Sequence, residues 1–228
     1  MQRKSINSIP KLDSNKLYEV LKYKLLNLEY IPGEMISENE IVKDYEVSRS
    51  IIRPAFTRLI IDKLLEVYPQ RGSFVTLLDI EEIKNLAYIR TLIEYDVLNN
   101  VLENCDETLL DNLKKGLNAQ KQLISNDSIN INDFFEIDTG FHELYYGFDG
   151  KLDLWHMIGE AQISYTRFRI LSLLVLKNYE DLYTEHYNIY TALKNKDKDE
   201  LKESIYNHIN IRLDSFSKDG IFKEYFKL

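Results

Sequence analysis

Apolar residues recur every three to four positions along most of the chain, which is the spacing of helices that bury one face. All four prolines fall within the first 70 residues, so turns interrupt the helical pattern there and not in the residues that follow. The pattern predicts a mainly α-helical protein of two domains. We place the boundary after residue 78, which gives an N-terminal domain of residues 1–78 and an all-helical domain of residues 79–228.

The N-terminal domain has the element order of a winged helix-turn-helix, in which a tight turn precedes the third helix and a hairpin follows it. Ser37 and Glu40 form a capping box at the start of the second helix. The third helix begins after an N-cap at Ser48 or Ser50. We expect helices at 16–28, at 38–45 and up to about 62, and strands at 64–68 and 73–77 joined by a turn at 69–72.

Arginine side chains gather where such a domain would contact DNA. Arg49 and Arg53 lie on the expected third helix, and Arg71 lies at the tip of the hairpin. The guanidinium group matches phosphate oxygens and the guanine edge, so the third helix is predicted to read DNA. A solvated surface helix with ordinary charges is the alternative interpretation.

The second domain reads as a bundle of helices with short connections. A capping box at 79–82 opens a long helix. Further helices are expected at about 108–125, 130–148, 152–176, 179–194 and 198–217, with a short one at 221–226. In the long helix that begins after Asp79, Arg90 and Glu94 occupy positions where the pattern predicts apolar residues. They are either an i,i+4 ion pair at the edge of the buried face or an arginine that faces a pocket.

One helical stripe mixes aromatic residues with two candidate metal ligands. Asp138 and His142 are four residues apart and therefore share a helix face. His186 and His208 also fall on apolar stripes. Imidazole nitrogens and a carboxylate suit a divalent ion such as zinc, nickel or manganese. Each histidine could equally be a hydrogen-bonded core residue, so spacing alone leaves the metal site open.

Composition narrows the class of protein. A single cysteine excludes a disulfide framework and a cysteine-built zinc finger. The longest apolar stretch, at 171–176, is far shorter than the roughly 20 residues of a membrane span, and the N-terminus does not read as a signal peptide. We therefore expect a cytoplasmic protein that does not insert into membranes.

The net charge of −8 at first argues against a nucleic-acid partner. The charge is unevenly divided, however. Residues 1–78 hold 12 Lys and Arg against 10 Asp and Glu, whereas residues 79–228 hold 17 against 27. Only the N-terminal domain is thus suited to DNA, and its weak positive charge predicts weak non-specific binding.

Three segments of the N-terminal domain resemble the GntR family of bacterial repressors: 32–38 (PGEMISE), 47–53 (VSRSIIR) and 69–75 (PQRGSFV). The resemblance implies operator contacts from the third helix and a wing at the hairpin. The residues that it assigns to DNA binding are Asn39, Ser48, Arg49, Ser50, Arg53, Arg71 and Gly72. The chain departs from the family pattern at Ser50-Ile51 and at Pro54. The proline would lie inside the third helix and so affect the operator sequence.

The second domain resembles the FCD ligand-binding domain of the FadR-type branch of that family. The matching segments are Asp138-x-x-x-His142, 185–193 (EHYNIYTAL), 207–209 (NHI) and Arg90-x-x-x-Glu94. By resemblance, Asp138, His142, His186 and His208 coordinate the metal. Arg90 and Glu94 would then lie where a small organic carboxylate binds.

The resulting hypothesis is a homodimeric transcription regulator whose affinity for operator DNA depends on the bound acid. The alternative is a metal-dependent hydrolase or isomerase that uses the three histidines and the aspartate. We do not expect an enzyme, because no free general base has an evident place beside the set.

Overall fold

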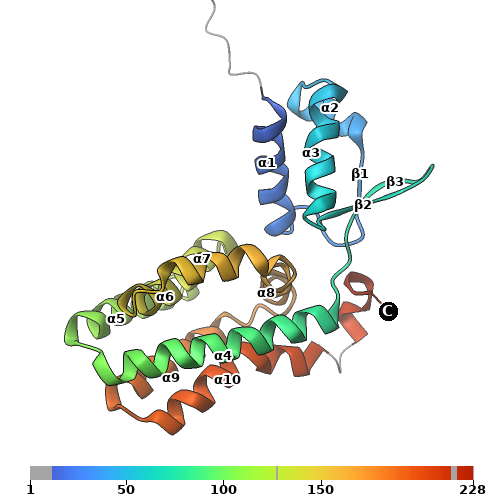
Figure 1. Cartoon of the computed structure of the whole chain (residues 1–228). Coiled ribbons are helices and arrows are strands. Elements are labelled where there is room, and N and C mark those ends of the chain that lie inside the picture. Colours follow the sequence, from blue (N-terminus) through green and yellow to red (C-terminus); the bar gives the residue numbers. More distant parts are fainter. Residues whose placement is uncertain (1–11, 127, 217–219, 228) are drawn as a thin grey trace, which may run out of the picture. The chain divides into compact units, whose positions relative to one another are not determined.

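The computed structural model describes residues 12–126, 128–216 and 220–227 (Figure 1). The chain divides into two compact units. The first comprises residues 12–77 together with Glu224–Phe226, and the second comprises Leu78–Lys223 and Lys227.

The first unit is a winged helix-turn-helix, as predicted. Its elements are α1 (Ser14–Leu26), β1 (Met35–Ile36), α2 (Glu38–Tyr45), α3 (Arg49–Ile61), β2 (Leu65–Tyr68) and β3 (Gly72–Val75). The three strands form an antiparallel sheet in the order β1-β3-β2. Sequence analysis missed β1, because a strand of two residues is too short to show an alternating pattern.

Of the two N-caps expected for the third helix, the structure has the earlier one, so the helix begins two residues before the position that the other N-cap would give. Ser48 is the N-cap and Ser50 lies inside α3, so Pro54 is the sixth helical residue. The helix continues through the proline to Ile61. Proline carries no N–H, so the hydrogen bond that residue 54 would donate to the carbonyl of Ser50 is missing.

A tight turn forms the tip of the wing hairpin, and an N-cap begins the helix that follows. Gln70 and Gly72 adopt positive φ angles of 62° and 119° at the hairpin tip. The second of these is a backbone conformation that favours glycine. Asp79 caps the first helix of the second unit through the backbone amides of Glu81 and Glu82.

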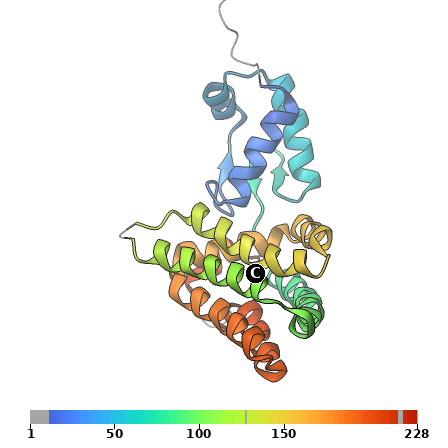
Figure 2. The same ribbon diagram turned by 90° about the vertical axis from the view of Figure 1, so that its left-hand side faces the viewer.

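The second unit is a bundle of α-helices that pack side by side (Figure 2). Its α-helices are α4 (Ile80–Asn104), α5 (Glu107–Ile124), α6 (Ile131–Phe148), α7 (Leu152–Ala161), α8 (Ile163–Leu176), α9 (Tyr179–Asn195) and α10 (Lys198–Phe216). The 3₁₀ helix η1 (Gly220–Tyr225) begins in this unit, and its last two residues are assigned to the first unit. None of the described helices is long and apolar enough to cross a membrane. The architecture confirms the predicted fold class.

One predicted helix is wrong in this unit. The helix expected at 152–176 is interrupted at Gln162, where φ is −102° and ψ is 35°. Apolar residues continue at helical spacing on both sides of this break. Periodicity therefore could not indicate it, and no proline or glycine occupies the break itself.

Candidate functional site

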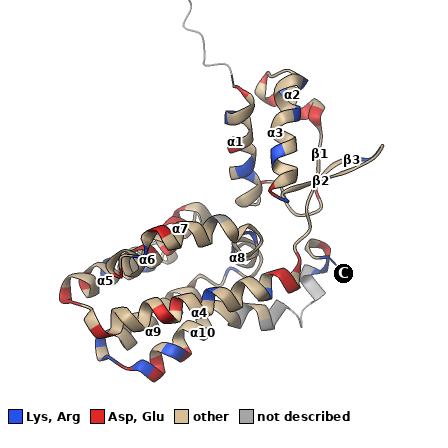
Figure 3. Cartoon of the chain, viewed as in Figure 1, with Lys and Arg blue, Asp and Glu red and all other residues tan. Residues whose placement is uncertain are grey.

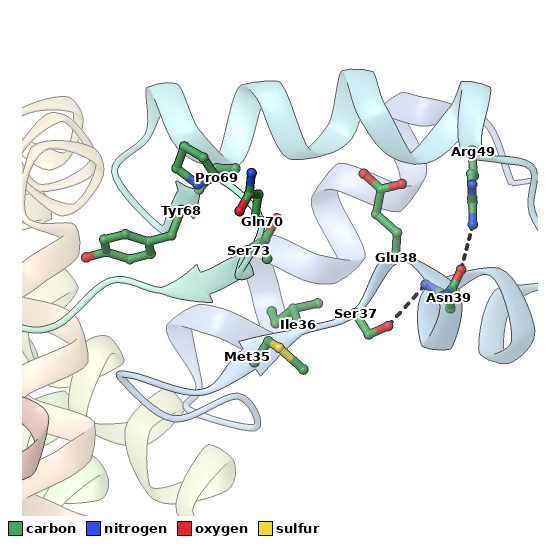
Figure 4. A pocket seen from close by; sticks show the side chains of 12 residues that line it. Met35, Ile36, Ser37, Glu38, Asn39, Arg49, Tyr68, Pro69, Gln70 and Ser73 are labelled. Atoms are coloured by element: carbon green, nitrogen blue, oxygen red, sulfur yellow. Dashed lines mark hydrogen bonds between the residues drawn. The ribbon is translucent and has the colours of Figure 1, made fainter.

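The first unit has a hollow of about 430 Å³ between the start of α3 and the wing, drawn in Figure 4. Arg49, Asn39 and Gly72 line it, although they come from three different elements. A guanidinium N–H of Arg49 donates to Oδ1 of Asn39 at 2.8 Å, and this bond links α3 to α2 (Figure 4). Glu38 and Gln70 are among the other polar residues of the lining.

All seven residues predicted to contact DNA are exposed. Ser48 and Ser50 share a hydrogen bond of 2.7 Å between their hydroxyl groups. Arg53 is exposed on α3 outside the hollow. The guanidinium of Arg71 lies 5.5 Å from the ring centre of Tyr68, so an aromatic side chain supports it at the wing. Basic residues also colour parts of α1 and α3 in Figure 3.

The second unit brings the three predicted histidines together. His142 on α6, His186 on α9 and His208 on α10 each offer a nitrogen within 4.8 Å of the others. All three are buried, the first two with no exposed surface. The Nε2 atoms of His142 and His208 are 3.3 Å apart. This arrangement suits a single divalent ion bound by imidazole nitrogens.

Each histidine has a partner at its Nδ1 atom. A Gln120 amide atom lies 2.9 Å from Nδ1 of His186, and the Glu185 carboxylate lies 3.0 Å from Nδ1 of His208. The Tyr145 hydroxyl contacts Nδ1 of His142. A group that holds one ring nitrogen sets the tautomer and leaves the other nitrogen for a ligand.

Asp138 lies beside the histidines but also has a partner of its own. Its Oδ2 accepts a hydrogen bond from Arg169. Its Oδ1 lies 3.6 Å from Nε2 of His186, and neither of these two buried atoms has a hydrogen-bond partner in the described structure. When Nε2 of His186 carries no proton, two buried lone pairs face each other, which is unfavourable, and a cation between them would satisfy both. The donor atoms therefore fit a metal ion.

The protonation states of the cluster also suit metal binding. Burial lowers the pKa of His142 and lowers that of His186 well below its usual value, so both imidazoles are neutral at pH 7. Burial opposes ionisation of Asp138, but the Arg169 guanidinium and the three neighbouring histidine rings together outweigh it and lower the pKa of the carboxyl group. Neutral histidine and ionised carboxylate are the forms that bind metal.

Arg90 and Glu94 form an ion pair inside the domain. The expected i,i+4 ion pair is present, but its side chains are only 3% and 0% exposed, so the pair lies within the buried face and not at its edge. Nε of Arg90 donates to Glu94 Oε1, and the Tyr145 hydroxyl donates to Oε2 at 2.7 Å. An Arg90 amino group lies 3.3 Å from both ring nitrogens of His142. The guanidinium thus borders the histidine cluster.

Aromatic rings enclose the same region. Trp155 stacks on His142 with ring centres 5.0 Å apart and planes inclined by 7°. The Arg90 guanidinium lies 5.2 Å from the centre of the Trp155 ring. Sequence analysis missed Trp155 and Gln120 as members of the site. Gln120 could have been found, because it is a polar residue in the apolar slot that follows Leu117 at helical spacing.

A winged helix-turn-helix followed by a helical domain is the organisation of a DNA-binding transcription regulator. The model of the bacterial regulatory proteins of the gntR family matches residues 13–75, and the model of the FCD domain matches residues 85–211. The chain belongs to the GntR family of bacterial transcription regulators and carries an FCD domain.

Known proteins of similar length resemble most of the chain. The HTH-type transcriptional repressor RspR of Escherichia coli is 28% identical over 196 residues, which are 86% of this chain and 85% of that protein. The Uxu operon regulator of Haemophilus influenzae is 24% identical and covers 98% of this chain and 90% of its own length. The structure of E. coli McbR/YncC has the same fold, with a TM-score of 0.65, 19% identity, and coverage of 90% and 98%.

These relatives decide between the two hypotheses for function. The matching families and the similar proteins are transcription regulators, so the chain is a regulator and not an enzyme. The alternative of a hydrolase or isomerase is therefore rejected.

Proposed function

We propose that a small organic acid, bound at a divalent metal ion in the second unit, controls the affinity of this regulator for its operator. His142, His186 and His208 would hold the ion together with Asp138. The observation that carries the proposal is the facing pair of unpartnered buried atoms, His186 Nε2 and Asp138 Oδ1. Zinc, nickel and manganese all accept this donor set, and when bound such an ion offers a further position to a carboxylate oxygen.

The position of Arg90 supports an anionic effector. Its guanidinium lies 3.3 Å from His142, so its positive charge adjoins the place where the histidines would hold a cation. Two adjacent positive charges in a buried site are stabilised by an anion between them. Glu94 holds Nε of Arg90 and leaves its amino groups to donate.

Exposure and fold support the DNA-binding side of the proposal. Asn39, Ser48, Arg49, Ser50, Arg53, Arg71 and Gly72 form the expected contact set. One such domain offers few cationic groups, so we propose a homodimer that reads two half-sites about 34 Å apart. The acid would shift the population between two arrangements of the dimer with different operator affinity. Regulation of this kind takes place in the cytoplasm, where the DNA is.

Substitution of one histidine tests the metal-dependent control. We expect His186→Ala to lower the metal content of the purified protein and to abolish the effect of the acid on DNA binding, while basal DNA binding is retained. Elemental analysis measures the metal. Fluorescence anisotropy on the DNA upstream of the regulator's own gene, with and without added zinc and a set of small carboxylic acids, measures the response.

His156 provides the matched control, because it is an exposed histidine on α7. His156→Ala is expected to keep both metal and response. A metal-to-protein ratio in His186→Ala equal to that of wild type would contradict the assignment of His186 as a ligand. A response to acid in fully metal-free wild-type protein would contradict the dependence of the effector on metal.

Arg49→Ala tests the DNA-contact set. A bidentate arginine–base contact is worth about 1–3 kcal/mol, so we expect operator affinity to fall at least about threefold. Arg58→Ala is the control, because Arg58 also lies on α3 but its guanidinium stacks on Tyr18 of α1, 3.5 Å from the ring centre. Equal operator affinity in wild type and Arg49→Ala would show that α3 does not read DNA in the proposed way.

A further inference from the structure

Gln120 is a buried polar residue on the apolar face of α5. Its side chain has no exposed surface, and Leu109, Leu113 and Leu117 precede it on the same face. Burial of an amide without a hydrogen bond is costly, so a glutamine in this slot requires a partner. The partner is His186 on α9, whose Nδ1 lies 2.9 Å from Nε2 and 3.1 Å from Oε1 of Gln120.

The chemistry of the ring decides which amide atom faces it. Nε2 of His186 points toward Asp138 Oδ1, and a nitrogen that binds metal must present a lone pair. The proton of the neutral ring then lies on Nδ1, which donates to the amide oxygen of Gln120. The carboxamide can present its oxygen by rotation, because oxygen and nitrogen are nearly equivalent in shape.

We infer that Gln120 is a positioning residue for the metal site: it selects the tautomer and orientation of His186 and so connects α5 to the ligands. The inference rests on the proposed function of the site. It extends that function, because metal binding then depends on the packing of α5 against α9.

The neighbouring histidine indicates what the amide contributes. Glu185 provides a charged acceptor to Nδ1 of His208, whereas Gln120 provides a neutral acceptor to His186. Loss of such a partner commonly weakens metal affinity about 10–100-fold. A carboxylate in place of the amide still accepts the proton and makes the imidazole a stronger donor. A role limited to filling space would instead be met best by an apolar side chain.

The experiment compares Gln120→Leu and Gln120→Glu in the full-length protein. The protein is stripped of metal, and its zinc affinity is measured by competition with a chromophoric chelator. We expect Gln120→Leu to bind zinc about 10–100-fold more weakly and Gln120→Glu to bind at least as tightly as wild type. Gln122→Leu is the control, because Gln122 is an exposed residue of the same helix, and it should match wild type.

The outcomes separate the two proposals. Zinc affinity of Gln120→Leu equal to wild type overturns the role of Gln120 and leaves the metal site standing. Equal losses in Gln120→Leu and Gln120→Glu also overturn it, provided that circular dichroism shows both variants folded. Should Gln120→Leu fail to fold, the zinc affinity of Gln120→Glu decides. An affinity at least equal to that of wild type supports the role of Gln120, and a weaker affinity overturns it. A wild-type protein that binds no zinc, nickel or manganese overturns the metal site and this inference together.

Discussion

At the scale of single residues, Arg90 and Glu94 form a buried ion pair in the second unit, in which each charge depends on the other. Burial alone would raise the pKa of Glu94, but the adjacent guanidinium of Arg90 and the ring of His142 lower it well below the usual value. The carboxylate is therefore ionised, and it balances the charge of a fully buried arginine. The sequence indicated that these residues are four apart, but it could not tell burial from the edge of a face.

We expect Glu94→Gln to destabilise the second unit, because it leaves the Arg90 charge buried without its counter-ion. Breaking a buried pair in this way costs about 3–5 kcal/mol. Urea denaturation followed by circular dichroism measures the free energy of unfolding.

Glu81→Gln is the matched control. Glu81 pairs with Lys84 on the same helix, but its side chain is 74% exposed. Exposed pairs contribute about 0–1 kcal/mol, so the control should change little. Similar effects of the two substitutions would contradict the importance of burial.

At the scale of elements, α3 shows how a helix tolerates an unfavourable residue. Pro54 removes one backbone hydrogen bond, yet the helix extends from Arg49 to Ile61. Pro54 and Ser50 are both exposed, so water can satisfy the Ser50 carbonyl that lacks its helical partner. Apolar residues on the opposite face, Ile52, Ala55, Phe56 and Leu59, are buried and hold α3 against the rest of the unit.

Replacing this proline should stabilise the first unit. Proline in a helix interior costs about 3 kcal/mol, and the early, exposed position reduces this, so we expect Pro54→Ala to raise the free energy of unfolding by about 1–2 kcal/mol. Thermal and urea denaturation of the full-length protein measure the change.

Pro69→Ala is the control, because it is expected to change the free energy of unfolding in the opposite direction. It lies in the wing turn, where Gln70 has a φ of 62° and the amide of Arg71 donates to the carbonyl of Tyr68 at 3.0 Å. Proline suits this position of a turn, so Pro69→Ala should lower the free energy of unfolding by about 0.4–1 kcal/mol. A loss of stability in Pro54→Ala would show that the proline is needed for the shape of α3.

At the scale of the whole molecule, the two domains differ in net charge. The first 78 residues hold only two more basic than acidic residues, and the excess of acid lies in the remainder. We therefore expect DNA binding to rest on a few arginines in each subunit of the proposed dimer. General electrostatic attraction contributes little.

This division predicts a shallow dependence of operator binding on salt. Three arginines in each of two subunits neutralise at most six phosphates, so the slope of log K against log salt concentration should be about −5 or shallower. Fluorescence anisotropy at salt concentrations between about 50 and 200 mM measures this slope. A slope near −10 would mean that many other basic residues contact the backbone.

Apart from β1 and the break at Gln162, the sequence predicts the elements of this protein to within a few residues. Capping side chains such as Ser37 and Asp79 mark helix starts, and helical periodicity marks buried faces, because both depend on residues that are close together in the chain. The same local logic placed Asp138 and His142 on one face of α6. Element order predicts the hairpin, and helical spacing makes the three histidines candidate ligands; the resemblance to a family adds the role of the hairpin as a wing and the metal role of the histidines.

Only the tertiary structure decided the partners of these residues. His142 and His208 are 66 positions apart, as are Gln120 and His186, and no periodicity relates such pairs. The pairing of Asp138 with Arg169, the burial of Arg90 and the break at Gln162 likewise depend on how helices pack. The physical reason is that a helix pattern specifies which side chains face inward, whereas the contacts they make there depend on the other helices.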